Sequence, residues 1–133
     1  MTGGEEGLYI LSDHGFTGIE QEVYLNAWLE QEGYLKFSKP DPEGLESIAP
    51  KTLAFALDPN RIYLNLKKRF PRGIVDASEK KALKEEISGK LLKLEYQGKK
   101  VVRRVFFGED IYAGPLLPKA PDLIVLGEPG FDM

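Results

Sequence analysis

The chain has 133 residues, 42% of them hydrophobic and 29% charged, which is the composition of a single folded domain with a core. Its net charge of -3 argues against nucleic-acid binding, because a protein that binds phosphate backbones needs a basic face. There is no cysteine for a disulfide or a thiolate, and no stretch reads as a signal peptide or a membrane span, so we expect a cytoplasmic location and no membrane partner.

The first predicted element is an apolar run at residues 7–13, GLYILSD, which is typical of a buried strand closed by Ser-Asp. Asp13 and His14 come at its end, and we expect Gly15 to let the backbone turn there. Neighbouring side chains leave a regular strand on opposite faces, so this pair can meet on one ion only where the strand has ended. A carboxylate and an imidazole suit zinc, manganese or iron. The alternative is an ordinary turn in which His14 makes an ordinary hydrogen bond.

Residues 19–32 predict a helix that presents apolar side chains on one face and is capped by Gly33. We place in the core the side chains of Tyr24, Leu25, Trp28 and Leu29. A short strand at 34–37 and a loop at 38–50 follow. Residues 52–69 predict a β-hairpin with its turn at 58–60, in which large apolar residues alternate with smaller ones.

The second half predicts one helix and two strands. Asp76 and Glu79 form a variant of the capping box, and the helix they open carries its apolar positions at Leu83, Ile87, Leu91 and Leu94. Its solvent side carries two i,i+4 pairs, Lys81 with Glu85 and Glu86 with Lys90. Residues 101–108 and 122–127 predict strands, joined by a loop at 109–121.

Four blocks, LYILSDHGF, YLNAWLEQEGYL, RIYLNLKKRFPRGIV and EDIYAGPLLPKAPDLIVLGEPGF, resemble in order and spacing the C-terminal part of the type I phosphodiesterase/nucleotide pyrophosphatase family. This family belongs to the alkaline phosphatase superfamily. The resemblance implies an α/β fold, with mixed α+β as the alternative: part of an alkaline-phosphatase-like sheet with flanking helices and an inserted hairpin. It also implies hydrolysis of a small-molecule phosphate ester at two metals, zinc or else manganese, and gives Asp13 and His14 the role of adjacent ligands to one of them.

In family members the nucleophile segment and an Asp-x-x-x-His motif lie upstream of Ser-Asp-His-Gly, and a further ligand histidine lies downstream. We therefore expect residues 1–133 to be one domain, an excised or truncated C-terminal part of a larger enzyme. It would hold an incomplete metal site, carry no catalytic residue of its own and be inactive alone. A strand cut from a larger sheet leaves an unpaired edge, so we also expect self-association into a homo-oligomer.

A basic stretch, NLKKRFPRG, is either a solvated loop or a contact to substrate phosphate. The family has asparagine and arginine at the positions of Asn65 and Arg69, which implies substrate binding by these two residues, but it has glycine where Lys68 stands. Two other interpretations of the whole chain remain open. One is a phosphoglycerate-mutase-like enzyme of the same superfamily, and the other is a free-standing binding or regulatory module with a vestigial metal pair.

Overall fold

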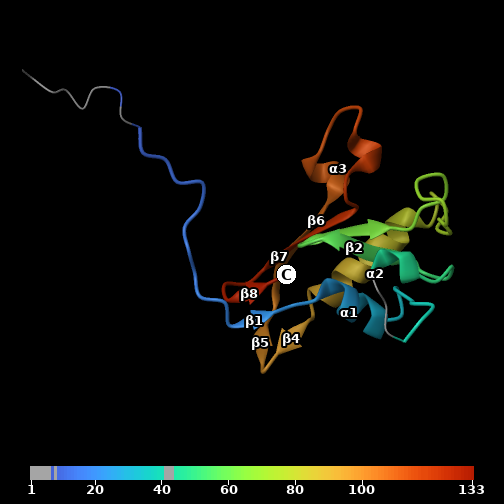
Figure 1. Cartoon of the computed structure of the whole chain (residues 1–133), viewed down its shortest axis with the longest axis horizontal. Coiled ribbons are helices and arrows are strands. Elements are labelled where there is room, and N and C mark those ends of the chain that lie inside the picture. Colours follow the sequence, from blue (N-terminus) through green and yellow to red (C-terminus); the bar gives the residue numbers. More distant parts are fainter. Residues whose placement is uncertain (1–6, 8, 41–43) are drawn as a thin grey trace, which may run out of the picture.

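A four-stranded sheet in the order β2-β3-β7-β6 forms the centre of the molecule (Figure 1). The computed structural model describes residues 7, 9–40 and 44–133. The strands of this sheet are β2 (Ala54–Asp58), β3 (Arg61–Leu64), β6 (Val102–Phe107) and β7 (Leu123–Gly127), and each neighbouring pair is antiparallel. Two smaller sheets pair β1 (Gln21–Glu22) in parallel with β8 (Phe131–Asp132), and β4 (Glu95–Tyr96) with β5 (Lys99–Lys100).

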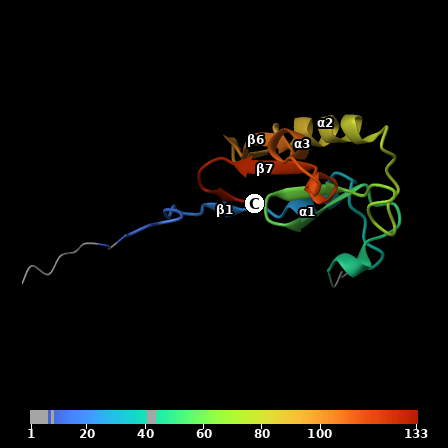
Figure 2. The same cartoon turned by 90° about the horizontal axis from the view of Figure 1, so that it is seen from above.

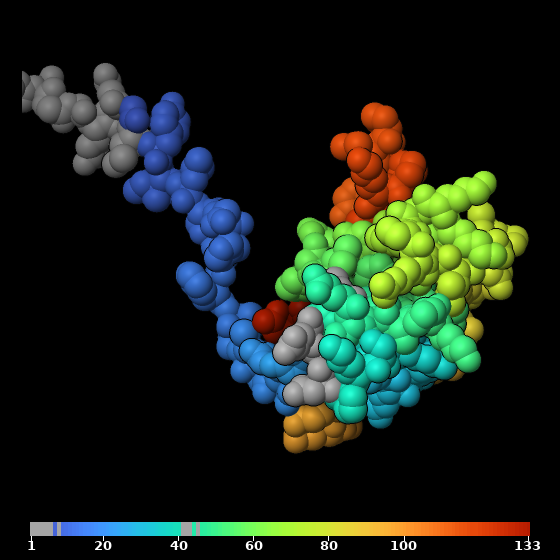
Figure 3. All heavy atoms as spheres, turned by 45° about the vertical axis from the view of Figure 1, so that its right-hand side comes forward, coloured from blue at the N-terminus to red at the C-terminus, as the bar shows by residue number. Residues whose placement is uncertain are grey.

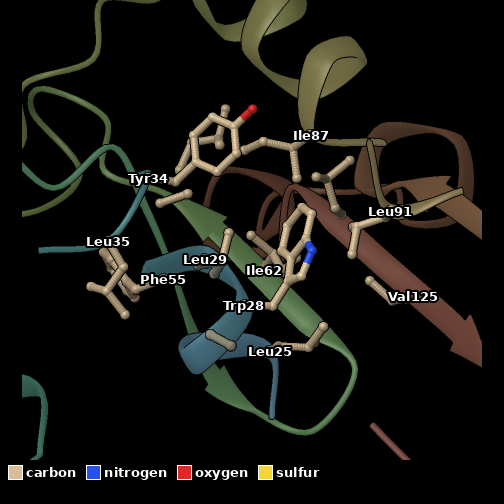
Figure 4. Close-up of a cluster of buried hydrophobic side chains, with 14 of the residues drawn as sticks. Leu25, Trp28, Leu29, Tyr34, Leu35, Phe55, Ile62, Ile87, Leu91 and Val125 are labelled. Carbon is tan, nitrogen blue, oxygen red and sulfur yellow. The ribbon is translucent and has the colours of Figure 1, made fainter. Parts of the chain in front are cut away.

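The helices are α1 (Leu25–Gln31), α2 (Lys80–Leu91) and the short α3 (Gly108–Ile111), with 3-10 turns η1 (Leu45–Ser47) and η2 (Leu117–Lys119). Side chains of α1, α2 and the sheet meet in one core, where Trp28 lies beside Ile87 and Leu91 (Figure 4). The expected mixture of helices and strands with a hairpin is therefore confirmed, in its α+β form. Within the described residues, no helix is long and apolar enough to cross a membrane.

The hairpin of β2 and β3 has the predicted turn, with Asn60 at a φ of 67°. The small residues Ala54 and Ala56 lie buried on one face, and on the other face Phe55 is buried whereas Leu57 is 47% exposed. The small size of the two alanines lets α1 approach closely, since the Asn26 side chain accepts a hydrogen bond from the Ala56 N–H at 2.7 Å and donates one to its carbonyl at 2.9 Å. The alternation of large and small residues indicated the strand, and α1 packs at Ala56.

The helix predicted from residue 19 begins only at Leu25. The chain before it pairs with β8 instead, and the Glu20 N–H donates to the Gly130 carbonyl at 2.7 Å. Tyr24 therefore precedes the helix and is 68% exposed, so its predicted place in the core is wrong, whereas Leu25, Trp28 and Leu29 are buried as expected. Gly33 caps the end at a φ of 83°, and residues 34–37 form a single bridge from Phe37 to Ile48 in place of a strand.

The strand predicted at 7–13 is wrong for the residues described there, and Leu8 lies outside them. Residues 9–20 run away from the body as extended, exposed chain (Figures 1 and 2). Tyr9, Ile10 and Leu11 are 85%, 87% and 91% exposed. A strand needs a neighbouring backbone for its N–H and C=O groups, and no described strand lies alongside this run. Its apolar pattern alone does not bury it.

The second half follows the sequence closely. The Asp76 N–H donates to Oε2 of Glu79 at 2.9 Å, one half of the predicted capping box, and α2 begins directly afterwards. Of the apolar positions predicted for this helix, Ile87 and Leu91 are fully buried. The ion pairs Lys81–Glu85 and Glu86–Lys90 are present at 3.9 and 3.8 Å. The two predicted strands are β6 and β7, and the loop between them contains most of α3 and all of η2.

Candidate metal centre

Ser12 to Gly15 form a local turn in the extended N-terminal segment. The Ser12 hydroxyl donates to the His14 carbonyl at 2.6 Å, and Nδ1 of His14 lies 3.0 Å from the Gly15 carbonyl. In the neutral form of the ring this contact requires the proton on Nδ1, because a carbonyl only accepts, and that form has its lone pair on Nε2. Gly15 is not left-handed and a Cβ there would meet nothing within 4 Å. The turn therefore does not depend on glycine, contrary to expectation.

Nε2 of His14 lies 3.6 Å from Oδ2 of Asp13, and the two side chains are 66% and 89% exposed. Two ligands bound about 2.1 Å from one zinc ion, at a tetrahedral angle, lie about 3.4 Å apart. The observed separation is close to that edge, so both atoms can reach one ion with little rearrangement. Sequence neighbours achieve this here because the backbone is turning, outside any regular strand.

Among the described residues, no third His, Cys, Asp or Glu side chain joins this pair in a group able to hold a metal. The buried carboxylate of Asp122 is only 1% exposed and is already paired with Arg69 and Lys80. Asp13 and His14 thus form a two-donor pair open to solvent. An ion held by two protein ligands keeps several waters, which lowers its affinity.

Asn65, predicted to touch substrate, is 4% exposed and holds two chain segments together. Its amide nitrogen donates to the Thr52 carbonyl at 2.9 Å and to the Arg72 carbonyl at 3.0 Å. Both hydrogens of the amide are therefore used inside the fold. These bonds fix the loop of residues 66–73, which carries the basic stretch, against the start of the hairpin.

Arg69, the other predicted substrate contact, lies in this loop and is 13% exposed. Its Nη1 donates to Oδ2 of Asp122 at 2.8 Å, and its Nη2 donates to the Ala120 carbonyl at 2.5 Å. The guanidinium also lies 5.2 Å from the ring centroids of Tyr63 and Phe70. The structure thus brings Arg69 to the segment before β7. The yellow-green loop that contains it lies on the opposite side of the body from the extended N-terminal segment (Figure 1).

Lys68 has a φ of 67°, which is the left-handed region that glycine favours. The family pattern suggested by the sequence has glycine at this position. A lysine therefore stands here at a backbone conformation that glycine adopts with less strain.

Two buried charged residues escaped the sequence analysis. Asp122 binds Arg69, Lys80 and the Leu64 N–H, the last at 2.8 Å. Lys84 is 2% exposed and pairs with Glu109 on α3. A signal for Lys84 was available, because it lies three residues before Ile87 and seven before Leu91, on the core face of α2. Asp122 offered no local signal, because its partners lie far away in the sequence.

The fold and the Asp13–His14 pair together define a mixed α+β protein with two potential metal ligands on an extended segment. The model of the type I phosphodiesterase/nucleotide pyrophosphatase family matches residues 4–133, and the chain belongs to this family. The resemblance carried by the four sequence blocks is therefore confirmed. A search of the curated proteins and a search of the solved structures each found no match.

Proposed function

We propose that this chain contributes Asp13 and His14 to a divalent metal site used in phosphate-ester hydrolysis. The observation that carries the proposal is the 3.6 Å separation between Nε2 of His14 and a carboxylate oxygen of Asp13, on side chains that are both exposed to solvent. Membership of a phosphodiesterase and nucleotide pyrophosphatase family supports the reaction class. It also favours this interpretation over the phosphoglycerate-mutase-like alternative.

Each residue has a distinct task in this proposal. His14 binds through neutral Nε2, with its ring orientation fixed by the contact between Nδ1 and the Gly15 carbonyl. Asp13 supplies an anionic oxygen that offsets part of the charge of the cation. This donor set suits zinc best, and manganese is the alternative. When bound, such an ion neutralises charge on phosphoryl oxygens.

The pair alone supplies half of the ligands of a four-coordinate zinc site. We therefore expect the 133-residue chain to bind zinc in the micromolar range or more weakly, about -8 kcal/mol at most. We assign no nucleophile to this chain, and so expect no turnover of a chromogenic phosphodiester by it alone.

Calorimetric titration of zinc into the chain tests the proposal. His14→Ala and Asp13→Asn should each abolish measurable binding, whereas Asp110→Asn, an exposed carboxylate on α3, should leave it unchanged. Binding that survives in both variants of the pair would place the metal elsewhere and overturn the assignment. Circular dichroism of each variant should match the wild type, because the pair lies outside the core.

A further inference from the structure

A pocket of about 610 Å³ lies between the loop of residues 66–69, the start of α2 and the segment that ends in η2. Its lining comes from residues 66–69, 80, 109 and 117–122. The yellow-green and orange parts of the chain that contain most of these residues stand near each other at the upper right of Figure 3. The size is typical of a small-molecule site. The pocket is remote from the extended segment that carries the metal pair, which leaves the body on the other side (Figure 2).

The lining of this pocket is basic in a chain that is acidic overall. Five cations and two carboxylates line it, and Lys67 is also paired with Asp76 outside the lining at 2.7 Å, so the net charge including that partner is +2, whereas the whole chain carries -3. The cations are Lys67, Lys68, Arg69, Lys80 and Lys119, and the carboxylates are Glu109 and Asp122. Such a concentration of positive charge in a concave site attracts anions.

Both carboxylates are already neutralised by partners. Asp122 is 1% exposed, and its two oxygens bind Arg69 at 2.8 Å and Lys80 at 2.9 Å. Glu109 pairs with the buried Lys84. Neither carboxylate therefore forms an ion pair with the remaining cations of the lining. Because both negative charges are balanced by their partners, they repel an incoming anion only weakly. Asp122 instead positions Arg69 and Lys80 at the pocket wall.

Lys68 and Lys119 reach the pocket from its two walls. No ion pair among the described residues involves either of them, and both are exposed. The left-handed backbone at Lys68 belongs to a loop fixed by Asn65, so this lysine projects from an ordered support. Beside these charges the wall is apolar, with Leu66, Leu117 and Pro121.

We propose that this pocket binds a phosphate monoester, with Lys68 and Lys119 holding the phosphate and the apolar wall contacting the organic group. Lysine ammonium groups suit phosphate as point charges, and an anion here meets few competing carboxylates. The proposal is independent of the metal pair. A cation bound there plays no part in it, so the two assignments can fail separately.

Titration with phenyl phosphate and with inorganic phosphate, in EDTA and followed by NMR amide shifts, tests the site. EDTA removes any metal-mediated binding at Asp13 and His14. We expect shifts at residues 66–69 and 117–122. Phenyl phosphate should bind at least threefold more tightly than inorganic phosphate, because only the ester contacts the apolar wall. Equal affinities would overturn the role of the organic group, and shifts confined to other residues would overturn the site.

The double variant Lys68→Ala/Lys119→Ala should weaken phenyl phosphate binding about tenfold, since each exposed charge contributes roughly a threefold effect. The matched control is Lys81→Ala/Lys93→Ala, which removes two exposed lysines outside the pocket and carries the same change in net charge. The control should bind within twofold of the wild type. Equal losses in the two double variants would show a nonspecific charge effect and overturn the proposal.

Discussion

Arg69 and Asp122 lie 53 residues apart in the sequence and are joined by a hydrogen bond of 2.8 Å between Nη1 and Oδ2. Asp122 at the same time pairs with Lys80 at the start of α2. The buried carboxylate of Asp122, directly before β7, thus holds the basic loop and the start of α2 together.

Replacing this carboxylate should destabilise the fold more than replacing an exposed one. We expect Asp122→Asn to lower the free energy of unfolding by about 2–3 kcal/mol. This is slightly less than for a fully buried pair, because Lys80 is 34% exposed and can be partly solvated. Asp76→Asn, which breaks the exposed pair with Lys67 at 2.7 Å, should cost about 1 kcal/mol or less. Urea denaturation measures both, and equal losses would contradict the importance of burial.

The Lys84–Glu109 pair should respond asymmetrically to mutation, because Lys84 is 2% exposed and Glu109 is 44% exposed. Lys84→Met removes the buried charge and fills the space, so the free energy of unfolding should change by less than about 1 kcal/mol. Glu109→Ala leaves the ammonium group buried with only the Phe107 ring beside it, at 4.5 Å, and should cost about 2 kcal/mol. Chemical denaturation would contradict this if Lys84→Met proved the more damaging change.

The same pair predicts a loss of stability in acid. Burial by itself raises the pKa of Glu109, but the hydrogen bond from Lys84, with smaller contributions from its own backbone and nearby charges, lowers it overall. A pKa that is lower in the folded state stabilises the protein above the unfolded value and loses this contribution as pH falls through the folded value. The difference in urea midpoint between wild type and Glu109→Ala should therefore be largest near pH 7 and shrink below the ordinary glutamate value of 4.5. A difference that stays constant down to pH 3 would contradict it.

Lys68→Gly should stabilise the fold while weakening the phosphate site. A left-handed backbone costs a non-glycine residue about 1–2 kcal/mol, and glycine removes this cost. Glycine also gives the unfolded chain more freedom, which cancels part of the stabilisation, so we expect the free energy of unfolding to rise by about 0.5 kcal/mol. Lys119→Gly removes the same charge at a residue without a positive φ and should not stabilise. Thermal denaturation distinguishes the two. A lower melting temperature for Lys68→Gly than for wild type would argue against strain at this position.

Self-association is expected from the apolar N-terminal segment. Ile10 and Phe16 are 87% and 99% exposed, and β2 and β6 each have one unpaired edge among the described strands. Such surfaces favour contacts with a second copy. Sedimentation should show species heavier than the 14.9 kDa monomer, and Ile10→Asp/Phe16→Asp should reduce them. The control Ile111→Asp/Leu116→Asp changes two exposed residues near α3 and should have less effect. A strict monomer at high concentration would exclude this association.

Local signals predicted the hairpin and α2 well. The turn at 58–60 and the bond between the Asp76 N–H and Glu79 involve residues close in sequence, so pattern and structure agree there. The family resemblance also indicated Asp13 and His14 as ligands to one ion; their donor atoms lie 3.6 Å apart, and their role as ligands stays a prediction.

Long-range partners set the limit of that analysis. An apolar run such as 7–13 indicates a tendency to form a strand, but a strand also needs a neighbouring strand to pair with, and the run itself does not reveal whether one is present. The start of α1 was misplaced for a related reason, since pairing of Gln21 with Phe131 at the other end of the chain competes with helix formation. The bond between Arg69 and Asp122 has the same long-range character, so the pocket it shapes could not be inferred from the stretch NLKKRFPRG alone.

The extended segment of residues 9–20 has a consequence for how metal binding and folding are coupled. The segment is held to the body where β1 pairs with β8 and where Glu20 contacts Lys99 at 2.6 Å, both after the metal pair in the sequence. Exposed, extended backbone is the form that proteases cleave most readily. A single cut between His14 and Glu20 would separate Asp13 and His14 from the hydrophobic core, which would keep all of its members. The proposed metal affinity and the conformational stability should therefore depend on different residues, so that substitutions can alter one with little effect on the other.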